Sequence, residues 1–125
     1  MTEAETAHVE ALSTRRWLSE ANPETYLPDV ATTLNNLAAL YSATQRMKEA
    51  ETAYLEALAT YRRLAQANPE AHLPDVATTL NNLANLYHAT QRMREAEAAY
   101  LEALAIRRRL AEANPEAYFP ISPTR

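Results

Sequence analysis

An all-α fold, built as a stack of antiparallel helix pairs, is predicted by three features of this 125-residue sequence. Glycine is absent, and Ala, Leu, Glu and Arg, which favour helix, are abundant. One segment also occurs twice: residues 69–114 repeat residues 23–68 with nine differences. A fixed period of 46 residues is typical of α-solenoids, in which each unit packs against the next.

The chain begins with half of a repeat. Residues 1–22 align with the second half of each later unit, so they predict one helix that ends at Asn22, because the residue before Pro23 is pushed out of the α region. We therefore expect a single domain of five helices. It consists of a half repeat at residues 1–22, full repeats at 23–68 and 69–114, and an irregular tail at 115–125.

The first helix of each full repeat is predicted at residues 28–44 and 74–90. Pro28 and Pro74 suit the first helical position, where the missing N–H costs no hydrogen bond. Six apolar residues of the first of these helices fall within an arc of roughly 120°, which predicts its core face. They are Val30, Ala31, Leu34, Leu37, Ala38 and Tyr41.

The second helix of each repeat is predicted at residues 47–67 and 93–113. Its apolar residues cover about 200° of the circumference, more than one neighbour can bury. Each of these helices should therefore pack against its own partner and also against the next repeat, as in a solenoid.

The pattern resembles the tetratricopeptide repeat in residue type and spacing. The string LNNLAxLY followed by EAExAYLEAL is most similar to the longer repeats of kinesin light chains and their bacterial relatives. A HEAT or armadillo array also fits a period near 46, but it would not require the Ala50/Tyr54/Ala57 pattern. The resemblance implies a superhelix that binds proteins or peptides. The usual period is 34, the familiar proline is Arg62 or Arg108, and the usual glycine is Gln45 or Gln91.

Composition argues against several other functions. The formal net charge of −4 is mild and mixed, so no nucleic-acid partner is expected. There are no cysteines, and no apolar run approaches the ~20 residues of a membrane span. The three histidines lie in different settings, and no metal-ligand or phosphate-loop motif occurs. We expect a cytoplasmic protein with no catalytic activity, cofactor, metal or membrane contact.

Paired asparagines indicate a binding surface. Asparagine is unfavourable inside a helix, yet Asn35-Asn36 recurs as Asn81-Asn82. Asn36 and Asn82 point away from the predicted core, and in the related families the corresponding asparagines contact bound peptides. Asn35 and Asn81 lie on the core flank and are predicted to make structural bonds. The predicted peptide-binding stripe comprises Thr32, Asn36, Ala39, Ala43, Thr78, Asn82, Asn85 and His88.

Self-association is the alternative function. The last helix has apolar residues with no following repeat helix to cover them, and the first helix lacks its partner, so we expect a homo-oligomer, in the simplest case a dimer. A third interpretation is that the chain is part of a longer array attached to a sensor or effector. The candidate self-association residues are Trp17, Leu101, Leu104 and Leu110.

Overall fold

The computed structural model describes residues 2–115, and the regular secondary structure in this part of the chain is all α-helix, as predicted. The irregular tail expected from residue 115 falls, beyond Pro115, outside the described residues. Successive helices pack against each other in an antiparallel stack, which confirms the predicted α-solenoid. The helices are α1 (Glu3–Ala21), α2 (Pro23–Ala43), α3 (Met47–Ala67), α4 (Pro69–Ala89) and α5 (Met93–Ala113).

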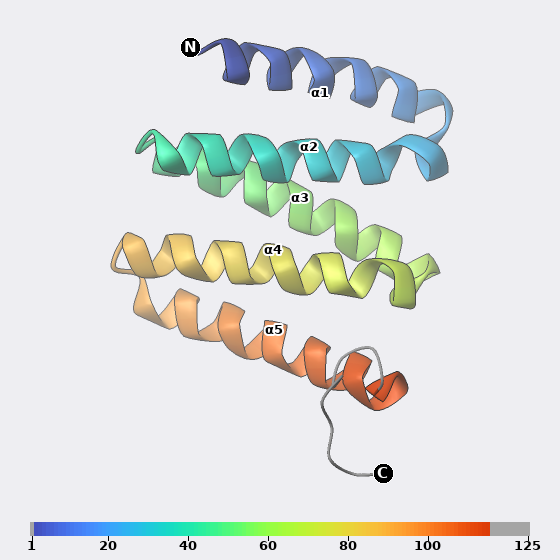
Figure 1. Cartoon of the computed structure of the whole chain (residues 1–125), viewed down its shortest axis with the longest axis vertical. Helices are drawn as coiled ribbons and strands as arrows, with labels where there is room; N and C mark the ends of the chain where they lie inside the picture. The colour runs from blue at the N-terminus through green and yellow to red at the C-terminus, as the bar shows by residue number, and fades with distance from the viewer. Residues whose placement is uncertain (1, 116–125) are drawn as a thin grey trace.

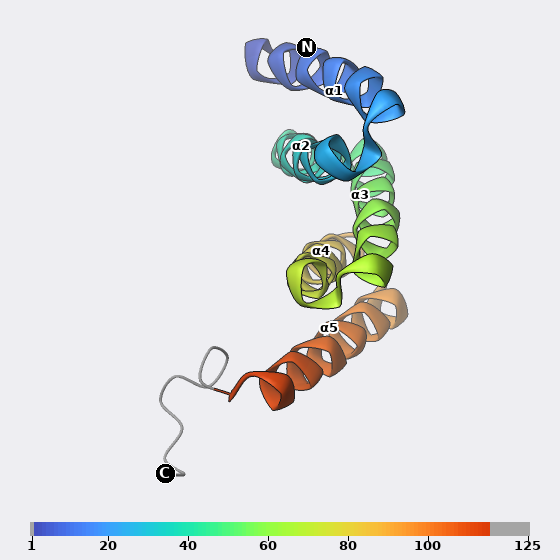
Figure 2. The ribbon, with the colours of Figure 1, turned by 90° about the vertical axis from the view of Figure 1, so that its right-hand side faces the viewer.

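The helices alternate between two layers. Figure 1 shows α2 and α4 side by side in front, with α3 behind and between them. Figure 2 shows the same layers edge on, with α2 and α4 seen along their axes and α1 and α5 at opposite ends of the stack. A hydrogen bond from Asn35 Nδ2 to Thr79 Oγ1 (3.0 Å) joins α2 directly to α4.

The predicted starts of α2 and α4 were wrong. Both helices begin five residues earlier, at Pro23 and Pro69, and contain Pro28 and Pro74 in their interior. The first turn is closed, since Tyr26 N donates to Asn22 O (3.2 Å). An internal proline gives up one backbone hydrogen bond, here to the carbonyl of the fourth preceding residue. Pro28 itself is half-buried.

The turn inside each repeat uses a left-handed residue that is not glycine. Gln45 and Gln91 have φ of 65° and 64°. They stand where the resemblance leads one to expect glycine, the residue that adopts this conformation without steric cost. Arg46 N then donates to Tyr41 O (2.7 Å), which closes the turn. The conformation that the family's glycine serves is thus kept with a different residue.

The core lies between the two layers. Val30, Ala31, Leu34, Leu37 and Ala38 are all buried, which confirms the predicted face of α2. Tyr41, the sixth predicted member, is half-buried and packs against the same cluster. Alanine at zero or near-zero exposure on both α2 and α3 lets the two backbones approach closely.

Candidate functional site

The eight predicted peptide-binding residues lie on α2 and α4, and we call them the polar face. Seven are exposed and Asn82 is half-buried. None is an Asp, Glu, Lys or Arg, so the face presents hydroxyls, amides, one imidazole and small side chains. The members are Thr32, Asn36, Ala39 and Ala43 of α2, and Thr78, Asn82, Asn85 and His88 of α4.

The two asparagines of the first pair differ in their contacts. Asn35 is half-buried, and its amide nitrogen bonds Thr79, so it makes the predicted structural bond. Asn36 is exposed, and its side chain makes no hydrogen bond within residues 2–115. In the second pair neither Asn81 nor Asn82 makes a side-chain hydrogen bond there, so the structural bond predicted for Asn81 was wrong. The amides of Asn36 and Asn82 thus keep both donors and an acceptor available.

Two tyrosines from the other layer also reach the polar face, which the sequence did not predict. Tyr61 of α3 shares a hydrogen bond with Thr32 (2.9 Å between the oxygens). Tyr100 of α5 donates from its hydroxyl to Asn85 Oδ1. Burial raises the pKa of the Tyr61 phenol, and the bond to Thr32 partly opposes this. Two of the eight predicted residues are therefore already tied to a neighbouring helix.

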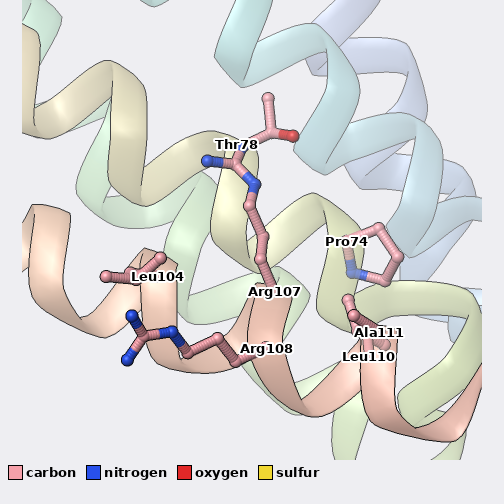
Figure 3. A pocket seen from close by; sticks show the side chains of 7 residues that line it. All are labelled: Pro74, Thr78, Leu104, Arg107, Arg108, Leu110 and Ala111. Carbon is pink, nitrogen blue, oxygen red and sulfur yellow. The ribbon is translucent and has the colours of Figure 1, made fainter. Parts of the chain in front are cut away.

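A cavity of about 430 Å³ opens where the polar face meets α5. Figure 3 shows Arg107 extending from α5 towards Thr78 of α4, with Pro74 and Leu110 on the other side of the same cavity. Arg107 stands where Tyr61 stands in α3. This replacement of Tyr61 by Arg107 is one of the nine differences between the repeats, and it was the feature of the sequence that could have indicated the cavity. The guanidinium of Arg107 places a positive charge beside Thr78, at one end of the polar face.

Ion pairs connect the second helices of successive repeats, a feature that the sequence did not predict. Arg16 Nη2 lies 2.8 Å from Glu56 Oε2, and Arg62 Nη2 lies 2.6 Å from Glu102 Oε2, one period further along. Both pairs are about half exposed. They bridge α1 to α3 and α3 to α5 at equivalent positions of successive repeats.

The turn arginines make a second repeating set. Arg46 Nη1 lies 2.5 Å from Glu5 Oε1, and Arg92 Nη1 lies 2.6 Å from Glu51 Oε1. Each guanidinium also stacks 4.5 Å from the centroid of the tyrosine five residues before it. A hydrogen bond from the Thr2 backbone, with Arg46 nearby, lowers the pKa of Glu5. Hydrogen bonds to Glu51 and Glu95 raise the pKa of Arg92.

The predicted self-association residues divide into two groups. Trp17, Leu101 and Leu104 are 69%, 59% and 42% exposed, so they are accessible on α1 and α5. Leu110 is only 6% exposed, because it lies on the side of α5 that faces α4. The expectation that Leu110 belongs to an exposed apolar strip was wrong, since a helical angle does not reveal which flank the neighbouring helix takes.

Residues 2–115 contain neither a candidate metal site nor a candidate membrane span. No group of three or more His, Cys, Asp or Glu side chains is arranged to hold a metal ion there. None of the described helices is long and apolar enough to cross a membrane.

Comparison with known proteins identifies the repeat. A family model described as tetratricopeptide repeat matches residues 29–109, which is well over half of the chain. No curated protein matches the sequence. The matched segment begins inside α2 and ends inside α5, so it includes all eight residues of the polar face and both asparagine pairs.

Proposed function

We propose that this chain, which belongs to the tetratricopeptide repeat family, is a scaffold that binds a peptide segment of another protein on its polar face. Repeats of this family mediate protein–protein interactions. The use of the polar face for that purpose is our proposal. The long second helices and the LNNLAxLY string also favour the kinesin-light-chain-like type of repeat.

The observation that carries the proposal is the contrast between the two asparagines of the first pair. Asn35 faces α4 and is bonded, whereas Asn36 is exposed and makes no side-chain hydrogen bond in the described part of the chain. An exposed asparagine in a helix interior costs several tenths of a kcal/mol relative to alanine and returns nothing to the fold. A hydrogen bond from the Asn36 side chain to a bound partner would account for asparagine at this position.

An amide matches the chemistry of an extended peptide. It donates through its nitrogen and accepts through its oxygen, so it can bond a main-chain carbonyl and N–H whatever the side chains are. Thr32 and Thr78, one turn before each asparagine, add hydroxyls along the same line. Asn85 and His88 are the positions of the polar face where α4 differs from α2, so we assign selectivity to them.

A peptide selected from a library of short unstructured sequences tests this proposal. Binding to wild type and to the Asn36→Ala/Asn82→Ala variant is measured by fluorescence anisotropy. Each lost bond is worth ~0.5–1.5 kcal/mol, so we expect binding weakened about five- to a hundredfold. N-methylation of single peptide amides should weaken binding at the positions that face the asparagines.

Gln66→Ala is the matched control, since it removes an exposed amide from α3, away from the polar face. It should bind the peptide as wild type does. All three proteins should melt at nearly the same temperature, because none of these side chains is part of the core. Equal affinity of wild type and the double alanine variant would contradict the assignment of the polar face.

Self-association is the second candidate function, and one observation favours it. Of the six large hydrophobic side chains exposed within residues 2–115, four belong to α5. That surface borders the polar face, since Tyr100 bonds Asn85 and one cavity is lined by both Thr78 and Leu104. A third candidate, that the chain is a segment of a longer array, predicts instead that a further repeat covers α5.

A further inference from the structure

Four exposed residues of α5 form a continuous line, which we call the α5 seam: Glu97, Leu101, Leu104 and Arg108. They follow each other at spacings of four, three and four residues. At 100° per residue they fall within an arc of roughly 60°. This spacing is that of a seam along which two helices pack together.

The same line on α3 is occupied inside the molecule. There Glu51 pairs with Arg92, and Arg62 pairs with Glu102. Leu58, which corresponds to Leu104, is 5% exposed beneath α4. The α5 seam has the same four residue types and, within residues 2–115, no ion-pair partner for either charge. On α3 one member of the line, Leu55, which corresponds to Leu101, is also 44% exposed. The α5 seam is therefore the copy whose two charges both lack a partner in the described chain and whose two leucines are both exposed.

The order of residues in the seam is self-complementary. The midpoint between Glu97 and Arg108 is also the midpoint between Leu101 and Leu104. If two such helices lie antiparallel about a two-fold axis at that midpoint, each glutamate faces the arginine of the other helix. Each Leu101 then faces a Leu104, so the apolar centre is flanked by opposite charges on both sides.

We propose that a second copy of this chain docks on the α5 seam, with the two α5 helices antiparallel about a two-fold axis. Met93 and Tyr100, which are 46% and 39% exposed, border the seam on one side and enlarge the apolar contact. A two-fold contact uses the same surface on both chains, so association stops at a dimer and does not continue into a polymer. This inference does not depend on the polar face or on any peptide ligand.

The opposite end of the stack does not offer an equivalent surface. On α1 the corresponding line is already used, since Glu5 pairs with Arg46 and Arg16 pairs with Glu56. Leu12 on that line is buried. Trp17 is the only large hydrophobic residue that α1 exposes in the described chain. Between the two ends, the apolar and charged groups therefore favour α5 as the interface.

A dimer through the α5 seam would carry two polar faces in one particle. A partner with two copies of the peptide segment could then engage both faces. The second contact would be intramolecular, which raises the overall strength of binding if the linker spans the two sites.

Measurement of molar mass by light scattering and sedimentation equilibrium, from micromolar to about millimolar concentration, tests the interface. Wild type should rise from 14.0 kDa towards twice that value as concentration increases. Leu101→Glu should weaken dimerisation at least tenfold, because the substitution places a charge in the apolar centre twice per dimer. Leu55→Glu is the matched control on α3, where the corresponding leucine is also exposed, and it should dimerise as wild type does.

A charge-reversal series tests the antiparallel arrangement itself. Glu97→Arg places arginines opposite each other at both ends of the seam, and Arg108→Glu does the same with glutamates. Each single variant should dimerise more weakly than wild type, with the difference reduced by salt. The double variant Glu97→Arg/Arg108→Glu restores opposite pairs and should recover most of the wild-type dimerisation.

Three results would overturn the proposal. A mass that stays at 14.0 kDa up to millimolar concentration would show that no second copy docks on the α5 seam. A dimer that Leu101→Glu leaves intact would place the interface elsewhere. A double reversal no better than the single variants would exclude the antiparallel two-fold pairing. Circular dichroism of every variant separates these results from a failure to fold.

Discussion

Helices α3 and α5 are nearly the same sequence in two different positions of the stack. They differ at five of 21 residues, yet their surfaces differ greatly in exposure. Tyr54 is 6% exposed and its counterpart Tyr100 is 39% exposed. The difference arises because α4 covers α3, whereas no described helix follows α5 (Figure 1). Burial in a repeat protein is thus a property of the neighbour as much as of the sequence.

The side of each helix that faces its own partner shows no such difference. Ala57 and Ala103 are both buried, as are Ala53 and Ala99. The two helices therefore have one internal face in common and one face that depends on the next unit. The following predictions test how far that division holds, beginning with the largest effect.

The largest difference between α3 and α5 is expected when the equivalent leucines, Leu58 and Leu104, are each replaced by alanine. Leu58→Ala removes a buried side chain and should lower the free energy of unfolding by ~2–5 kcal/mol. Leu104→Ala, at the matching position on α5, removes one that is 42% exposed and should cost about 1 kcal/mol or less. Urea denaturation at low micromolar concentration measures both.

The low concentration keeps dimerisation from adding stability to wild type and to Leu58→Ala, which both retain the α5 seam. Leu55→Ala, at an exposed position of α3, is the additional control and should resemble Leu104→Ala. Equal losses for Leu58→Ala and Leu104→Ala would contradict the idea that the following helix determines burial.

The division into a common face and a dependent face also explains what could be predicted from the sequence. The apolar period placed the core of α2 correctly, because Leu34 and Leu37 are buried whichever neighbour is considered. The core of α2 depends on a helix and its own partner, which the repeat itself defines. The angle of Asn35 also separated it from Asn36, although its bond reaches Thr79 in the next repeat.

The features that were missed depend on packing between units. Leu110 lies on a flank that the helical angle alone could not assign. The ion pair of Arg62 with Glu102 joins residues 40 positions apart, and neither residue type is unusual on a helix surface. Pro28 was misplaced for a different reason, since Pro23 also suits a first helical position and Asn68 caps the equivalent start of α4. Local rules could not show the first two of these features.

The loss of folding stability at low pH should depend on the carboxylate of Glu5 on α1. Glu5, Glu51 and Glu97 occupy one repeat position, and Glu5 is buried beside Arg46. The Thr2 backbone and Arg46 lower the pKa of Glu5 below its ordinary value. Its contribution should therefore be complete above about pH 4.3 and be lost as the pH falls through the lowered pKa.

Thermal unfolding between about pH 7 and pH 2 measures this dependence. Glu5→Gln should flatten the fall in melting temperature on the acid side, because glutamine has no proton to gain. Glu97→Gln, at the same position on the open helix, is the matched control. An acid profile of Glu5→Gln identical to that of wild type would show that the contact with Arg46 does not influence stability.

The smallest expected effect concerns the ion pairs between repeats. Arg62 and Glu102 are 48% and 47% exposed, so solvent screens their attraction. A double-mutant cycle with Arg62→Ala and Glu102→Ala should yield a coupling of ~0.2–1 kcal/mol that decreases with added salt. The cycle of Arg108→Ala with Glu102→Ala should show no coupling, because Arg108 has no carboxylate partner within residues 2–115. A coupling of equal size in both cycles would mean that the pairs reflect general charge balance, and that the register between α3 and α5 rests on apolar packing alone.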